Sequence, residues 1–270
     1  MSSTPEQNER HPDGQISTEV RGNIFLIGID RPEKYNGFTP KMFGELADAY
    51  AELENNSELW VGVLFAHGKH FTAGLDLPKF ADAMKNGEAI LPTNGIDPFS
   101  LKPPFRTKPV VAAMNGICYT AAIELMLATE IVVSAKSARY SQLEVGRGVM
   151  AAAGATFRMV ERAGWGNAMK VLLTGYEFNA EEALRYNFIQ EIVDDGEEFN
   201  RALELAEEIA KQAPLAVQAT LQSSRAYYFD SPKAAVDEFI PVMKALANTD
   251  DAAEGVQSFI EKRPPVYKGK

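Results

Sequence analysis

The chain has 270 residues, of which 46% are hydrophobic, a size and composition that fit a globular protein of one large or two small domains. Its formal net charge of −10 argues against a nucleic-acid or anionic-membrane partner, because both require clustered positive charge. The single cysteine, Cys118, excludes an internal disulfide and fits a reducing compartment, so we expect a cytoplasmic protein. Residues 1–15 contain no apolar segment, which indicates a disordered tail rather than a secretory signal.

Apolar segments with strand and helix patterns alternate along the chain after this tail. Expected strands cover 22–29, 60–66, 110–114, 130–134, 138–141 and 189–193. Expected helices begin at Pro40 after the cap Thr39, near Leu77, around Thr120, over 156–162 and 167–173, and at the capping-box sequence Asn179–Glu182. Residues 86–108 have little periodicity and are a candidate lid. From Glu197 onward the spacing is helical.

This order of elements predicts an α/β fold with a mostly parallel sheet and helices packed against it. We divide the chain into the tail over 1–15, a core over 16–196 and a helical C-terminal region over 197–270.

The most informative stretch is the apolar segment between Lys108 and Glu130, whose only charged residue is Glu124. Its length would admit a membrane span, but the Asn115-Gly116 turn and the small residues after it favour a buried strand, a loop and an apolar helix. A carboxylate in such a helix is protonated, hydrogen-bonded or functional, because burying it bare is costly. Alternatively, Glu124 lies on the one solvated side of the helix.

No phosphate-binding loop, serine-nucleophile elbow or cysteine–histidine metal spacing is present in the sequence. We therefore expect neither a metal nor a separate cofactor. Two small-residue turns, Gly74-Leu75 and Ala121-Ala122, follow apolar strands and are suited to aim backbone N–H groups at a carbonyl oxygen. Glu144 is a second carboxylate among apolar neighbours, and two carboxylates near a polarised carbonyl suit proton transfer at the adjacent carbons. Both turns are equally compatible with ordinary connections.

Several segments together resemble the crotonase superfamily, which contains the enoyl-CoA hydratase/isomerase proteins. The resemblance covers about residues 18–268. The matching segments, in chain order, are IDRPEKYNGF, HFTAGLDL, KPVVAAMNGICYTAAIELMLATEI, YSQLEVGRGV, LLTGYEFNAEEALRYNFIQEIV and FIEKRPPVYKG.

The resemblance implies a spiral of ββα turns, a helical C-terminal trimerisation region, and a homotrimer or dimer of trimers. It also implies an acyl-CoA thioester substrate, with coenzyme A present only as part of that substrate. The backbone N–H groups of Leu75 and Ala121 would hold the thioester oxygen. Glu124 would activate a water that adds to Cβ, and Glu144 would handle the Cα proton.

Residues that would contact CoA are also implied by the matched segments. Arg31, Lys34, Ala73 and Lys79 match the nucleotide-contacting loops, and the tail residues Lys262 and Arg263 match a segment that often reaches a neighbouring subunit's CoA.

The sequence departs from the family pattern around the site. Thr120-Ala121-Ala122 replaces a glycine triplet, Leu143 replaces the usual proline before the second glutamate, and Met150–Ala153 replaces a turn rich in proline and glycine. Added methyl groups narrow the backbone conformations and intrude on the site. The leading hypothesis is a hydro-lyase that adds water reversibly to a 2-enoyl-CoA. The alternatives are an enoyl-CoA isomerase, a hydrolase of C–C bonds, or a non-catalytic acyl-CoA-binding protein.

Overall fold

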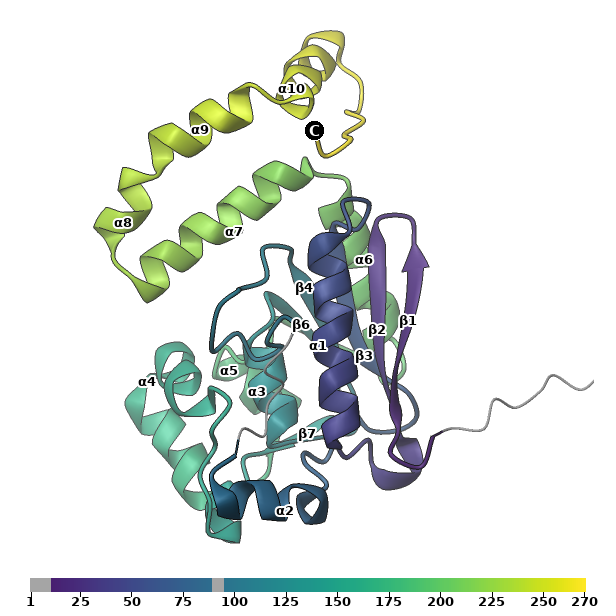
Figure 1. Ribbon diagram of the computed structural model, residues 1–270, viewed down its shortest axis with the longest axis vertical. Helices are drawn as coiled ribbons and strands as arrows, with labels where there is room; N and C mark the ends of the chain where they lie inside the picture. Colours follow the sequence, from purple (N-terminus) through teal and green to yellow (C-terminus); the bar gives the residue numbers. More distant parts are fainter. Residues whose placement is uncertain (1–10, 89–94) are drawn as a thin grey trace, which may run out of the picture.

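The protein, described by a computed structural model over residues 11–88 and 95–270, is built on a six-stranded sheet (Figure 1). The strand order is β1-β2-β3-β4-β6-β9, in which β1 and β2 are antiparallel and all other neighbours are parallel. The strands are β1 (Gln15–Arg21), β2 (Ile24–Asp30), β3 (Val61–Ala66), β4 (Val110–Met114), β6 (Ile131–Ala135) and β9 (Glu191–Val193). The predicted α/β fold with a mostly parallel sheet is confirmed.

A second, three-stranded sheet contains β5 (Ile117–Tyr119), β7 (Arg139–Ser141) and β8 (Phe178–Asn179). Consecutive strands enter different sheets, since β4 and β6 belong to the large sheet and β5 and β7 to the small one. A helix follows each pair: α3 (Ala121–Leu127) after β5, and the short turn η2 (Glu144–Arg147) and α4 (Ala155–Thr174) after β7. A bridge from Thr72 to Cys118 joins the segment after β3 to the same small sheet, before α2 (Leu77–Asn86). These repeats form the expected ββα spiral.

Helices cover both faces of the large sheet because its strands are apolar on both sides. On β2, Phe25 and Ile27 pack in the core shared with α1 (Pro40–Asn55), whereas Ile24 and Leu26 pack with Ala202 of α6 (Glu198–Ala210). The alternation follows from the two-residue repeat of a strand. As predicted, α1 begins after Thr39, whose side chain accepts a hydrogen bond from the backbone N–H of Met42.

The C-terminal helices extend beyond the sheet at one end of the molecule (Figure 1). They are α6 (Glu198–Ala210), α7 (Pro214–Phe229), α8 (Pro232–Asp237), α9 (Phe239–Ala247) and α10 (Asp250–Glu261). The first of them, α6, packs on β3, β4 and β6, so the part that stands away from the core begins with α7. An ion pair of 3.0 Å between Arg225 Nη2 of α7 and Glu130 Oε1 links this part to the core.

Of the remaining elements, three short strands differ from the sequence-based expectations: β1, β5 and β8 carry no clear sequence signal, since each is short or polar. The two helices expected over 156–162 and 167–173 both form within α4, on either side of Gly164, whose φ of 74° and ψ of 163° are not helical. As the capping-box sequence predicts, the side chain of Asn179 caps α5 (Ala180–Arg185) by accepting from the backbone N–H of Glu182.

The 86–108 segment is described only in part. Residues 89–94 and tail residues 1–10 lie outside the described residues, and 95–108 contains no helix or strand. A lid role for 86–108 therefore stays a prediction. Within the described ranges, no helix combines the length and hydrophobicity needed to cross a membrane.

Candidate active site

A cavity of about 570 Å³ opens between α2, the N-terminus of α3 and the segment from η2 to Ala153. Its apolar walls include Phe43, Leu77, Met84 and Phe99. Both predicted backbone donors, Leu75 and Ala121, line it together with both predicted glutamates, Glu124 and Glu144, and with Ala73, one of the expected CoA contacts. The structure thus brings together side chains that are up to 71 positions apart in the printed sequence.

The turn that carries Leu75 is held by hydrogen bonds to the loop after β2. The Thr72 hydroxyl donates to the backbone oxygen of Asn36 at 2.7 Å and accepts from the backbone N–H of Gly74 at 3.0 Å. The backbone N–H of Ala73 donates to the oxygen of Tyr35 at 3.0 Å. Gly74 has a φ of 100°, which favours glycine. The N–H of Leu75 has no hydrogen-bond acceptor within the described chain, so it is available to a ligand.

The second turn is the start of α3. The backbone N–H groups of Ile123 and Glu124 donate to the oxygen of Thr120, whereas the N–H of Ala121 has no acceptor among residues 11–88 and 95–270. Unpaired N–H groups of this kind are inherent to the first turn of a helix. The backbone at Ala121, like that at Leu75, can therefore donate to an oxygen in the cavity.

Glu124 is only 4% exposed and is hydrogen-bonded on one oxygen. Its Oε1 atom accepts from the backbone N–H of Ala153 at 2.7 Å and from that of Ala155 at 3.2 Å. Burial raises the pKa of Glu124 to about 7, while these two amides lower it and the nearby charge of Glu144 raises it. The solvated-surface interpretation of Glu124 is wrong, because its side chain lies between the core and the cavity.

Glu144 lies in η2, two positions after Gln142, whose Nε2 donates to Glu144 Oε1 at 3.1 Å. The other oxygen, Oε2, is buried and has no hydrogen-bond partner within the described chain. Burial raises the pKa of the Glu144 carboxyl above its ordinary value. Both carboxyls thus bind a proton more tightly than an exposed glutamate does, and a pair of such groups can supply one acid and one base.

The residues expected to contact CoA are placed in different ways. Lys34 is exposed and lies after β2. Lys79 lies on α2, and its Nζ atom is 2.5 Å from Asp13 Oδ1. Arg31 is buried, and its Nη1 donates to Asp76 at 2.8 Å and to the oxygen of Gly37 at 3.0 Å. Arg31 therefore helps to hold the donor turn through Asp76, which follows Leu75 directly, and its expected contact with CoA stays a prediction.

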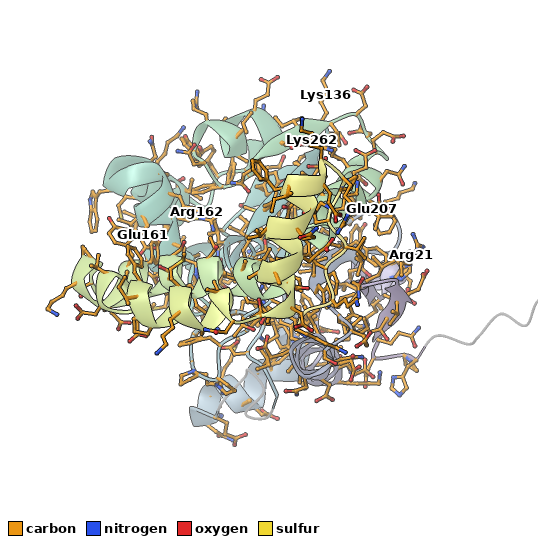
Figure 2. All side chains as sticks on the ribbon, turned by 90° about the horizontal axis from the view of Figure 1, so that it is seen from above. Arg21, Lys136, Glu161, Arg162, Glu207 and Lys262 are labelled. Carbon is orange, nitrogen blue, oxygen red and sulfur yellow. The ribbon has the colours of Figure 1, made fainter. Side chains whose placement is uncertain are left out.

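The two tail cations lie far from the cavity of their own chain. α10 is at the opposite end of the molecule from α2 in Figure 1, and Figure 2 shows Lys262 at the end of α10. Arg263 is engaged by Glu254, at 2.6 Å, and by Glu261, at 2.5 Å. Any contact of Lys262 or Arg263 with CoA therefore requires the cavity of another subunit.

Several groups of the site escape prediction from sequence. The amides of Ala153 and Ala155 hold Glu124, but a backbone donor has no side-chain signature. Gln142 could have been found as the polar residue two positions before Glu144. Arg147 also lines the cavity and has no ion pair within the part of the chain that the structure describes. No group of three or more His, Cys, Asp or Glu suited to a metal ion occurs among these residues.

Comparisons with known proteins agree with this arrangement. Residues 19–270 match the family model described as enoyl-CoA hydratase/isomerase. Enoyl-CoA hydratase EchA19 of Mycobacterium tuberculosis is 31% identical over 269 residues, 97% of this chain and 98% of the relative. The 2,3-dehydroadipyl-CoA hydratase of Escherichia coli is 28% identical over 247 residues, 92% of this chain and 96% of the relative.

Solved structures give the same result. The crystal structure of a probable enoyl-CoA hydratase/isomerase from Mycobacterium abscessus superposes with a TM-score of 0.92 at 39% identity, covering 94% of this chain and 98% of that one. An enoyl-CoA hydratase structure from Mycobacterium tuberculosis H37Rv superposes with a TM-score of 0.87 at 32% identity, covering 96% of this chain and 100% of that one. The predicted resemblance is confirmed: the chain belongs to the enoyl-CoA hydratase/isomerase family.

Proposed function

We propose that the protein is an enoyl-CoA hydratase-like lyase in which Glu124 and Glu144 add water reversibly to a 2-enoyl-CoA. The observation that carries this proposal is the shared cavity, into which both glutamates and both donor turns project. The relatives named hydratases support the reaction class. The apolar walls suit an acyl chain, and coenzyme A enters as part of the substrate.

In the proposed reaction, the thioester oxygen accepts hydrogen bonds from the backbone N–H groups of Leu75 and Ala121. These donors stabilise the negative charge that develops on that oxygen when water adds to Cβ. The ionised carboxylate of Glu124 takes a proton from the attacking water, and the protonated carboxyl of Glu144 donates a proton to Cα. The same steps in reverse remove water from a 3-hydroxyacyl-CoA.

Two features of the site bear on which glutamate is the base. The stronger burial of Glu124 favours a proton on that residue, whereas its two amide donors favour its anion. Oε2 of Glu144 has no donor, which favours a proton on Glu144. We assign the base to Glu124 in its ionised form, which prevails above its pKa of about 7 and is stabilised by the amides of Ala153 and Ala155.

We also propose a homotrimer or a dimer of trimers, with a cytoplasmic location. Exposed apolar side chains support the assembly, because an apolar face of this size is normally covered. They lie on α8–α10 and are Val236, Phe239, Ile240, Met243, Val256, Phe259 and Ile260. In such an assembly, Lys262 and Arg263 of one subunit could approach the CoA of another, while Lys34 and Lys79 are nearer their own cavity.

The test is hydration of crotonyl-CoA by the wild type and by Glu124→Gln and Glu144→Gln. Each amide keeps the shape of the side chain but cannot exchange the proton, so kcat should fall about 10²- to 10⁴-fold. Glu88→Gln is the matched control, because Glu88 lines the same cavity outside the pair. Undiminished hydration by Glu144→Gln would remove Glu144 from the mechanism. Conversion of a 3-enoyl-CoA without hydration would instead identify an isomerase.

A further inference from the structure

Thr120, the first residue of the altered triplet, has a backbone conformation that β-branched residues rarely adopt. Its φ is 52° and its ψ is −112°, a region that strongly favours glycine. The surrounding structure must therefore hold the residue in place. The backbone N–H of Thr120 donates to the oxygen of Ser141 at 2.9 Å, and its own oxygen accepts from α3. Strain of this kind is found preferentially at functional sites.

The side chain of Thr120 lies where the two donor turns meet. An ideal Cβ built on Gly74 would come within 1.8 Å of Thr120 Oγ1, so the hydroxyl lies directly against Gly74. Gly74 precedes the donor residue Leu75, and Thr120 precedes the donor residue Ala121. The hydroxyl thus contacts the residue that precedes one backbone donor and belongs to the residue that precedes the other.

The Thr120 side chain lines the cavity, and its hydroxyl has no hydrogen-bond partner among residues 11–88 and 95–270. The buried threonines Thr39, Thr72 and Thr129, in contrast, each donate through Oγ1 to a backbone oxygen. A half-buried hydroxyl that faces a cavity and has no partner is a group that a bound polar atom can satisfy.

We propose that the Thr120 hydroxyl is a third donor to the oxygen of the acyl thioester, beside the N–H groups of Leu75 and Ala121. Glycine at this position offers no such group, so the residue would be a catalytic departure of this chain from the usual triplet. The proposal rests on the proposed function for the binding of an acyl-CoA. It does not depend on hydration being the reaction, because any chemistry through an enolate needs the same oxygen stabilised.

The first experiment measures crotonyl-CoA hydration by Thr120→Ser, Thr120→Ala and Thr120→Gly. Serine keeps the hydroxyl and should retain activity within about 3-fold, whereas alanine and glycine should lower kcat about 10- to 100-fold with little change in KM, as expected for a donor used in the transition state. Asn187→Gly is the control, since Asn187 has a φ of 59° and does not line the cavity.

Thermal unfolding separates this role from a structural one. Thr120→Gly removes the strain and should raise Tm by a few degrees while it lowers kcat. A slower and more stable variant cannot be explained by misfolding. Wild-type activity in both Thr120→Ala and Thr120→Gly, or faster turnover in either, would overturn the proposal.

A second experiment does not require turnover. Acetoacetyl-CoA bound at the site forms an enolate that is followed by ultraviolet absorbance during a pH titration. The pKa of the bound ligand should rise in Thr120→Ala and Thr120→Gly but not in Thr120→Ser, because only the first two lose a donor to the enolate oxygen. An unchanged ligand pKa in all three variants would refute the third donor. A Thr120-dependent pKa in a protein that hydrates no enoyl-CoA would sustain this inference and refute the proposed function.

Discussion

Replacing Glu124 by Gln should make the stability of the protein depend less on pH. In the unfolded chain the Glu124 carboxyl releases its proton near its ordinary pKa of 4.5, whereas burial holds the proton until about pH 7 in the native protein. Between these values the native state binds more protons than the unfolded state, so the free energy of unfolding of the wild type falls as pH rises. Glutamine cannot titrate, and its Oε1 can still accept from the amides of Ala153 and Ala155.

The size of the effect follows from the distance between the two pKa values. Each pKa unit corresponds to about 1.4 kcal/mol, so ionising Glu124 costs the native state about 3 kcal/mol by pH 8. Little of this is screened by solvent, because the residue is 4% exposed. The difference in the free energy of unfolding between Glu124→Gln and the wild type should therefore grow by about 3 kcal/mol from pH 4.5 to pH 8.

Urea unfolding at one protein concentration, followed by the fluorescence of Trp60 and Trp165, measures this difference at each pH. Glu254→Gln is the control. The shift in the pKa of Glu254 has the opposite direction to that of Glu124, because the Arg263 guanidinium lowers it to about 2. Its carboxyl is ionised in both states above about pH 6, so that variant should differ from the wild type by a constant amount there. If the free energy of unfolding of Glu124→Gln differs from that of the wild type by the same amount from pH 4.5 to pH 8, the Glu124 carboxyl is not held neutral in the native state.

Three further predictions concern residues around the site and the C-terminal helices. Asn36→Ala should lower the free energy of unfolding by about 3 kcal/mol in urea titrations, because the fully buried amide donates to the oxygens of His67 and His70 and those oxygens would lose their donor. Arg147→Met should lower kcat/KM for an enoyl-CoA with a terminal carboxylate more than for an uncharged one of equal length, because Arg147 is a cation on the cavity wall; equal losses would contradict this. Phe259→Ser, at an 85% exposed site on α10, should shift a trimer toward monomers in sedimentation velocity, and an unchanged assembly would exclude this face from the interface.

The elements that the sequence predicted best are those whose signal is local. The β-branched apolar runs of β3 and β4 and the Thr39-Pro40 start of α1 were found because their residues specify the structure directly. The polar β1 and the three-residue β5 were missed, since they pair only because neighbouring strands supply the hydrogen bonds.

The two glutamates of the site could be predicted from the sequence, whereas the burial and the partners of the residues around them could not. Glu124 stands out as a lone charge in an apolar helix and Glu144 as a second carboxylate among apolar neighbours, and the family resemblance adds a separate role for each. The burial of Arg31 could not be foreseen, because its partner Asp76 is 45 positions away and an arginine in a loop is normally solvated. The resemblance gave its approximate place but not its role in holding the donor turn.

The altered triplet shows how a local departure can be absorbed. Of the three residues with added groups, Thr120 and Ala121 line the cavity, whereas Ala122 is fully buried in the core, and the Thr120 side chain reaches Gly74. A side chain at position 74 and one at position 120 compete for the same space, so Thr120 is compatible with this site because position 74 is glycine. The same glycine, at a φ of 100°, sets the direction of the Leu75 N–H. The contact between Gly74 and Thr120 thus affects both the backbone donor at Leu75 and the position of the Thr120 hydroxyl on the cavity wall.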